Sequence, residues 1–167
     1  MLRLMTIAQQ KIVPFLWFDT QAEEAVQSYL SIFPSSKITA TTRYPEGTPQ
    51  PAGSVMTIAF ELDGQQFVAL NGGPNFKFNE AVSFVVNCDT QEEIDHYWSA
   101  LTADGGEPIQ CGWLKDRYGL AWQIVPTVFW EMIESSDAPR TARVMGVMMQ
   151  MQKFDLAALK RAAAAEK

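Results

Sequence analysis

The chain has 167 residues, of which 47% are hydrophobic, and this is enough for one domain or for two packed half-domains. Lysine and arginine number 13 against 19 aspartates and glutamates, so the formal net charge is −6, and no basic run carries interleaved aromatic residues. This charge argues against a nucleic acid as partner, because a phosphate backbone would be repelled.

Membrane insertion and disulfide formation are not expected from the sequence either. No apolar run is long enough to span a bilayer, and residues 1–8 lack the apolar length and the cleavage site of a signal peptide. The two cysteines, Cys88 and Cys111, are not closely spaced, which favours reduced thiols over a disulfide or zinc framework. We therefore expect a cytoplasmic protein.

One stretch of the sequence occurs twice. The triplet Asp19-Thr20-Gln21 returns 70 residues later as Asp89-Thr90-Gln91, and apolar runs at residues 12–18 and 81–86 precede the two copies. Apolar residues at helical spacing follow both triplets. We interpret this as a duplicated unit in which a strand leads into a helix with one apolar face. The alternative is that a common pattern arose by chance in two unrelated helices.

Each copy carries a capping-box signature at the start of its helix. Thr20 is followed three residues later by Glu23, and Thr90 by Glu93. In such a box the hydroxyl and the carboxylate each accept a hydrogen bond from a backbone N–H that the helix leaves without a partner. The sequence therefore predicts that both helices start at these threonines.

The remaining elements follow in the same order in each half. The patterns predict strands at residues 37–44, 55–62 and 66–70 in the first half and shorter strands at 108–111, 112–115 and 120–125 in the second. Residues 45–54 contain three prolines and two glycines, which predict a mobile loop without fixed structure. Both halves thus share a βαβββ plan. We expect a single domain over residues 1–167, with a first module at 11–74 and a second at 80–126.

A helical extension is predicted over residues 127–167, after the duplicated part. Its segments are a helix opened by Pro126 and two more at residues 139–152 and 155–166. The middle helix is rich in methionine and has more than one apolar stripe, so a second surface should cover it. We expect that surface to be a partner subunit in a homodimer, and the alternative is a groove of the same chain. The apolar residues of this helix are Val144, Met145, Val147, Met148, Met149 and Met151.

The motifs of the chain resemble those of the vicinal oxygen chelate superfamily, which includes glyoxalase I, bleomycin-resistance proteins and extradiol dioxygenases. The resemblance spans residues 11–162 and opens on Ile-x-Pro-Phe-Leu-x-Phe-Asp at 12–19. The stretches at residues 14–18, 69–74 and 111–116, the last reading Cys-Gly-Trp-Leu-Lys-Asp, are similar to the PhnB-like branch, often labelled 3-demethylubiquinone-9 3-methyltransferase. The resemblance implies an α+β fold in which the tandem βαβββ repeats form curved mixed sheets, as in glyoxalase.

The resemblance also implies a divalent metal in active members, held by His, Gln or Glu from the first and last strands of each half. In this sequence residues 12–18 and 81–86 contain no imidazole, carboxylate or amide. The last strands offer Asn71 and Gln123, which are neutral amides and poor ligands for such an ion. We therefore expect no metal and no cofactor.

Other catalytic patterns are weak. His96 is the single histidine and follows Asp95 on a predicted helix, which indicates a solvated helix face. No strand followed by Gly-x-Gly suggests a site for the nucleotide end of S-adenosylmethionine, so the residues do not support the methyltransferase label. Cys111 would be a nucleophile only if Lys115 or Arg117 lowered the pKa of its thiol.

Large aromatic residues on short strands predict a small-ligand pocket between the curved sheets, although each aromatic taken singly is an ordinary core residue. Our preferred hypothesis is a metal-free protein that binds a small planar molecule. The alternatives are a lyase, isomerase or transferase that uses Gln123 and Asn71 with a metal or cofactor, and a dimeric interaction protein without a ligand. The predicted ligand-binding residues are Phe15, Trp17, Asn71, Cys111, Trp113, Trp122 and Gln123.

Overall fold

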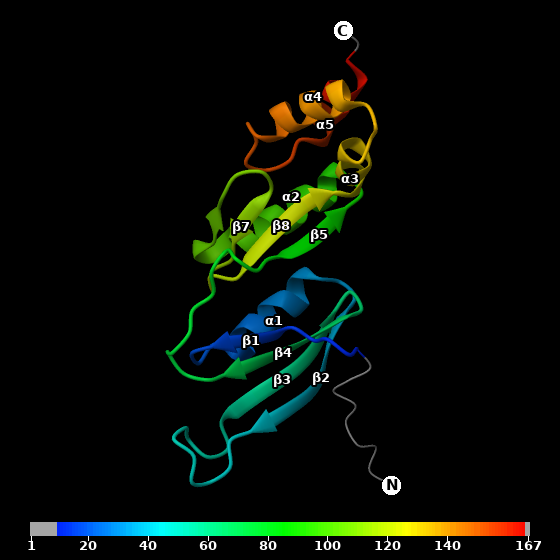
Figure 1. The fold of residues 1–167 in the computed structure, drawn as a ribbon. Coiled ribbons are helices and arrows are strands. Elements are labelled where there is room, and N and C mark those ends of the chain that lie inside the picture. The colour runs from blue at the N-terminus through cyan, green and yellow to red at the C-terminus, as the bar shows by residue number, and fades with distance from the viewer. Residues whose placement is uncertain (1–9, 166–167) are drawn as a thin grey trace. The chain divides into compact units, whose positions relative to one another are not determined.

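The structure is a computed structural model that describes residues 10–165. The N-terminal residues examined for a signal peptide, and the end of the helix expected at 155–166, lie outside the described residues. The chain divides into two compact units, Met1–Lys77 and Phe78–Lys167, which Figure 1 shows as ribbons and which we describe one at a time. The single-domain organisation stays a prediction. No helix within residues 10–165 has the length and hydropathy needed to cross a membrane.

The first unit has the predicted order of strand, helix and three strands. Strand β1 is parallel to β4, whereas β2, β3 and β4 are antiparallel, so the sheet order is β1-β4-β3-β2. The hairpin between β3 and β4 turns at Asp63 and Gly64, which both have positive φ. The elements are β1 (Phe15–Phe18), α1 (Ala22–Ile32), β2 (Ser36–Arg43), β3 (Val55–Leu62) and β4 (Gln65–Asn71).

The second unit repeats this plan and continues into the extension. Its sheet order is β5-β8-β7-β6, with β5 parallel to β8, which matches the first sheet strand for strand. The predicted α+β fold class with tandem βαβββ repeats and C-terminal helices is confirmed. The elements are β5 (Phe84–Cys88), α2 (Gln91–Thr102), a short 3-10 helix η1 (Ala103–Gly105), β6 (Glu107–Pro108), β7 (Trp113–Lys115), β8 (Ala121–Pro126), α3 (Thr127–Ile133), α4 (Ala138–Met148) and α5 (Leu156–Ala164).

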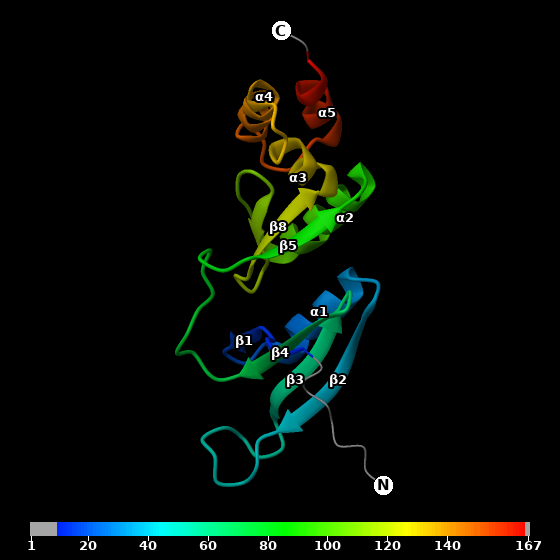
Figure 2. The ribbon, with the colours of Figure 1, turned by 45° about the vertical axis from the view of Figure 1, so that its right-hand side comes forward.

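Helix α1 covers one face of the first sheet (Figure 2). Its buried residues include Val26 and Tyr29, and the Tyr29 ring stacks on Phe60 with the centroids 6.4 Å apart. The Phe60 ring in turn stacks on Phe67 at 5.3 Å. The strand register places Leu16 beside Ala69 on this same covered face. Burial of apolar area under α1 therefore stabilises the unit. A smaller buried cluster lies on the other face of the sheet and consists of Ala40, Ala59 and Val68, with Val13 packed against it.

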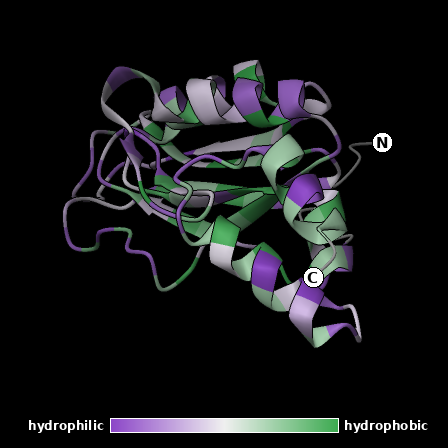
Figure 3. Ribbon diagram, turned by 90° about the horizontal axis from the view of Figure 1, so that it is seen from above, coloured by the Kyte–Doolittle hydropathy of each residue, from purple (hydrophilic) through white to green (hydrophobic). Residues whose placement is uncertain are grey.

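The second unit buries the corresponding face of its sheet under α2. Ile94 and Leu101 of the helix are buried, and so are Leu114, Trp122 and Ile124 of the strands. The register pairs Leu114 with Trp122, so these residues lie on one face. Figure 3, which colours the ribbon by hydropathy, shows that the helices carry both hydrophobic and hydrophilic residues.

The two copies of the Asp-Thr-Gln triplet cap their helices differently. The predicted box is confirmed in the second copy, where the Thr90 hydroxyl accepts from the Glu93 N–H and the Glu93 carboxylate accepts from the backbone of Thr90. The box predicted at Thr20 is wrong, because the N-cap of α1 is Gln21 and its side chain makes no capping bond.

In the first unit, Asn71 at the end of β4 caps the start of α1. The Asn71 Oδ1 atom accepts a 2.8 Å hydrogen bond from the Ala22 N–H at the start of α1, and its Nδ2 donates to the Val55 carbonyl at 3.1 Å. Asn71 is buried. The start of α1 is thus stabilised by a residue 49 positions later in the chain.

Residues 45–54 contain neither helix nor strand, as predicted, and the mobility of this loop stays a prediction. The Tyr44 N–H donates to the Ser54 carbonyl, and the Gly53 N–H donates back to the Tyr44 carbonyl at 2.8 Å. The Arg43 guanidinium also donates to the Gly53 carbonyl. These bonds close the base of the loop, and the proline and glycine content of residues 45–54 does not predict them.

Helix α4 packs on α5 of its own chain. Val144 and Met148 are buried, and the Arg143 Nε donates to the Ala162 carbonyl of α5. Met149, at the C-cap of α4, is 58% exposed. The own-chain groove therefore covers part of the methionine-rich surface, and the homodimer stays a prediction.

We expect the substitution Asn71→Ala to lower the free energy of unfolding by roughly 2–3 kcal/mol, because it removes a helix cap and leaves a buried carbonyl without its donor. Urea denaturation followed by circular dichroism measures this loss. Thr20→Ala is the matched control and should change the same free energy by less than about 0.5 kcal/mol. Equal losses in the two variants would contradict the assignment of the cap to Asn71.

Candidate functional site

The face of the second sheet opposite α2, which we call the open face, carries a row of three residues across β7, β8 and β5. The register places Trp113 and Val85 on either side of Gln123. Trp113 and Gln123 are half-buried, and Val85 is 41% exposed. The Gln123 Nε2 donates to the Ser83 hydroxyl at 2.9 Å. The row therefore presents an amide between an indole and an aliphatic side chain.

A second tryptophan lies at one end of the open face. The Trp130 Nε1 of α3 donates a 2.9 Å hydrogen bond to the Asn87 Oδ1 of β5. Asn87 is two residues from Val85 and so points to the same face. Our sequence analysis missed Trp130 and Asn87 as site residues. The sequence signal that could have indicated Trp130 is its position about one helical turn after β8, the last strand of the second module.

Lys115 lies at the other end of the open face, and two carboxylates form ion pairs with it. Its Nζ is 2.7 Å from Glu107 and 3.4 Å from Glu80. The hydrogen bond to Glu107, followed by the weaker contact with Glu80, raises the pKa of the Lys115 ammonium above its ordinary value. Lys115 thus stays charged but paired.

The predicted residues of the first unit include two aromatics on the face of the sheet that α1 leaves uncovered. Phe15 is 59% exposed. The Trp17 Nε1 donates to the Gly73 carbonyl at 2.8 Å, and the Phe76 ring meets the Trp17 ring edge-on at 4.9 Å. A Cβ atom at Gly72 would lie 2.4 Å from the Trp17 ring, so glycine is required there. Trp17 is therefore fixed by Gly72, Gly73 and Phe76, which follow β4.

Asn71 and Trp122 lie on the helix-covered faces rather than the open ones. Both polar groups of Asn71 bond to backbone, as described above. Trp122 is 3% exposed, and its Nε1 donates to the Asp116 carboxylate at 2.9 Å. The other carboxylate oxygen of Asp116 accepts from the N–H groups of Tyr118 and Leu120. These contacts give Asp116 a structural role in the turn at residues 116–119. We therefore leave Asn71 and Trp122 out of the site that we propose.

Both cysteines are free thiols, but their surroundings differ. Burial, aided by the charges of Glu93 and Asp89, raises the pKa of the Cys88 thiol to about 12. Cys111 is partly exposed and adopts a φ of 59° at the entry to β7. Lys115 is held by the carboxylates named above, and Arg117 lies 3.1 Å from Asp104. His96 is exposed on α2, as predicted.

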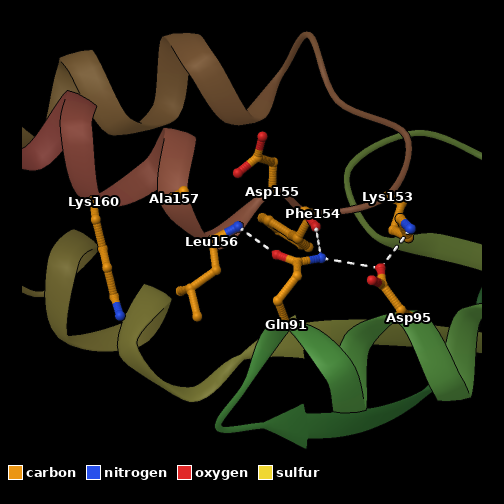
Figure 4. A pocket seen from close by; sticks show the side chains of 8 residues that line it. All are labelled: Gln91, Asp95, Lys153, Phe154, Asp155, Leu156, Ala157 and Lys160. Carbon is orange, nitrogen blue, oxygen red and sulfur yellow. Dashed lines mark hydrogen bonds and ion pairs between the residues drawn. The ribbon is translucent and has the colours of Figure 1, made fainter.

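A hollow of about 470 Å³ lies between α2 and the start of α5 (Figure 4). None of the predicted ligand-binding residues lines it. Three of its polar side chains are engaged in attachment: the Gln91 amide contacts the backbone of Phe154 and Leu156, and Lys153 pairs with Asp95 at 2.5 Å. We assign this hollow to the attachment of the extension rather than to a ligand.

The side chains on the open faces of the two sheets do not fit the divalent ion that the resemblance to the vicinal oxygen chelate superfamily implies. No cluster of three His, Cys, Asp or Glu residues suited to a metal occurs within residues 10–165. On the open sides of the two sheets the edge strands present Phe15 and Trp17 in β1 and Val85 in β5, and β8 presents Gln123. Aromatic rings and one neutral amide are unsuitable ligands for such an ion.

The paired βαβββ sheets, each with one helix-covered face and one open face, define a protein of the vicinal oxygen chelate fold. The model of the 3-demethylubiquinone-9 3-methyltransferase family matches residues 10–125, and the chain belongs to this family. The PhnB protein of Bacillus cereus is 38% identical, with a TM-score of 0.65, over 71% of this chain and 100% of that one.

More distant structures share only the fold. Protein PA1353 from Pseudomonas aeruginosa is 22% identical with a TM-score of 0.58, over 71% of this chain and 98% of that one. The fosfomycin resistance protein FosX from Mesorhizobium loti is 10% identical with a TM-score of 0.53, over 77% of this chain and 99% of that one. The sequence has no significant match among curated proteins.

We expect the protein, when purified without chelators, to contain zinc, nickel, manganese and iron far below one ion per chain, because the site positions lack suitable ligands. Elemental analysis by mass spectrometry measures this content. FosX from Listeria monocytogenes, whose structure was solved with Mn(II), is a suitable positive control. A stoichiometric metal that is lost on substitution of Gln123 would overturn the expectation.

Proposed function

We propose that the protein binds a small, planar organic molecule on the open face of the second sheet, without a catalytic metal. The observation that carries the proposal is the row of Trp113, Gln123 and Val85 across three strands. The Gln123 Nε2 is engaged by Ser83, which leaves its Oε1 to accept a hydrogen bond from a ligand. The flanking indole and isopropyl groups supply an apolar surface for a flat ring.

This geometry favours a neutral ring that carries an O–H or N–H donor. Lys115 is balanced by Glu80 and Glu107, so it offers little net attraction to an anion. Stacking on an indole contributes about 0.5–1.5 kcal/mol beyond area burial, and a hydrogen bond to the amide a similar net amount. The family name refers to a demethylated ubiquinone, which is a hydroxylated ring, and this supports the same ligand class.

We do not extend the family name to methyl transfer by this chain. The proposal concerns binding, and Gln123 would orient a hydroxyl rather than activate it, because a neutral amide is no general base. Trp17 and Phe15 belong to the corresponding face of the first sheet, and Cys111 to the loop that enters β7. The expected cavity between the two sheets stays a prediction because it involves both units.

We further propose a cytoplasmic homodimer in which the exposed end of α4 contributes to the interface. Two free thiols agree with a reducing compartment. Met149, which is exposed and adaptable, is the residue we expect to be covered by a second copy.

The ligand class is tested with 2-naphthol and 2-methoxynaphthalene, which differ in the hydrogen-bond donor. We expect 2-naphthol to bind more tightly by about threefold to tenfold, as one net hydrogen bond allows. Titration followed by tryptophan fluorescence and calorimetry measures both affinities. Gln123→Leu should abolish the preference and keep the weaker binding, whereas Trp113→Ala should weaken both compounds. An unchanged preference in Gln123→Leu would refute the assignment.

The dimer is tested by sedimentation at micromolar concentration, where we expect a species of twice the 18.7 kDa chain mass. Met149→Glu should shift the protein toward the monomer, because a carboxylate at a covered apolar position is costly. Ser99→Glu, which adds the same charge at an exposed position of α2, should leave the dimer intact. A monomeric wild-type protein would reject the proposal.

A further inference from the structure

We propose that the C-terminal extension positions Trp113, acting through Cys111 and Gly112, and thereby sets the affinity of the open face for its ligand. This inference rests on the proposed function. The family match ends at residue 125, so the extension lies outside the part of the chain that the family shares. Its contacts with the second module nevertheless reach the loop that enters β7.

The segment between α4 and α5 supplies two carbonyl groups to that loop. The Cys111 N–H donates to the Met151 carbonyl at 2.8 Å, and the Gly112 N–H donates to the Gln152 carbonyl at 2.7 Å. The Gly112 carbonyl accepts in turn from the Ile124 N–H of β8 at 2.8 Å. The loop is therefore bonded on one side to the extension and on the other to the strand that carries Gln123.

Close packing reinforces these bonds. Cys111 and Gly112 have φ angles of 59° and 82°, a left-handed conformation that costs free energy for a residue other than glycine. A Cβ atom at Gly112 would lie 2.4 Å from the Phe154 ring. Phe154 is 2% exposed and its ring centroid is 5.2 Å from that of Phe129. The Phe154 ring thus occupies the space that only glycine at position 112 leaves free.

The Gln91 amide holds this segment from the α2 side, as Figure 4 shows. Its Nε2 donates to the Phe154 carbonyl at 3.1 Å, and its Oε1 accepts from the Leu156 N–H at 2.8 Å. The nearby pair of Lys153 and Asp95 adds a second attachment, and its hydrogen bond lowers the pKa of the Asp95 carboxyl. One amide therefore bonds both the carbonyl of the buried Phe154 and the N–H of Leu156 at the start of α5.

The duplication provides the matched comparison. Gln21 occupies the position of Gln91 in the first copy, but its Oε1 accepts from the N–H of its neighbour Thr20 at 3.2 Å. Gln21 belongs to the first unit, whereas the extension belongs to the second. A substitution at Gln21 therefore removes the same side chain without touching the attachment.

Trp113 transmits the effect to the site because it follows Gly112 directly. Its N–H donates to the Gln110 carbonyl and its carbonyl accepts from the Ile109 N–H, so its backbone belongs to the same loop. The register then places its indole beside Gln123. A loop released from Met151 and Gln152 would leave the indole without a fixed position, and a stacking surface that is not preorganised binds more weakly.

The experiment compares Gln91→Ala with Gln21→Ala. The rate at which the Cys111 thiol reacts with 5,5′-dithiobis(2-nitrobenzoic acid) in the folded protein reports the loop and requires no ligand. Cys88 does not compete, because its side chain is fully buried, and this burial also raises the pKa of its thiol to about 12. The affinity for 2-naphthol reports the open face. We expect Gln91→Ala to raise the thiol rate and to weaken 2-naphthol, each by about fivefold, and Gln21→Ala to change neither.

Each outcome decides the inference. An unchanged thiol rate in Gln91→Ala overturns it, and so does a raised rate with unchanged 2-naphthol affinity, since the attachment would then be structural only.

If the wild-type protein binds no naphthol, the proposed function fails. The near-ultraviolet circular dichroism of Trp113, isolated by comparison with Trp113→Phe, then replaces affinity as the second readout. If Gln91→Ala does not fold, Gln91→Asn, whose amide is too short to reach both groups, takes its place.

Discussion

Each four-stranded sheet depends on the burial of one of its faces under a single helix. Because side chains alternate across a strand, apolar residues facing α1 or α2 fix which residues face the other way. In the second unit, Leu114, Trp122 and Ile124 go under α2, so Trp113 and Gln123 must be open. The candidate site is therefore a consequence of core formation. A register shift of one residue would exchange the two sets.

Duplication has preserved the fold while the contacts around the two copies have diverged. The same Asp-Thr-Gln triplet starts both helices, yet Thr90 caps α2 whereas Asn71 caps α1. Gln91 attaches the extension, and its counterpart Gln21 bonds locally. A helix start needs an acceptor for its first N–H groups, but the acceptor does not have to be local. The fold thus tolerates loss of a cap in one copy because another strand supplies it.

The shared scaffold does not impose shared chemistry. FosX from Listeria monocytogenes has this fold and was solved with Mn(II), whereas the strands of this chain present indole, phenyl and amide groups at their open faces. Function resides in the side chains grafted onto the fold, so a shared fold does not carry the metal site of one member to another.

The sequence determined the βαβββ order, the second capping box and the exposed position of His96, because strand alternation, helix periodicity and capping are local properties of the chain. It did not determine the cap of α1, the bonds that close the loop at residues 45–54, or the burial of Trp122. Each of these depends on groups far apart in the chain that meet only after the strands pair. The sequence shows which residues are apolar, but the strand register, which arises from packing, decides which face each one occupies.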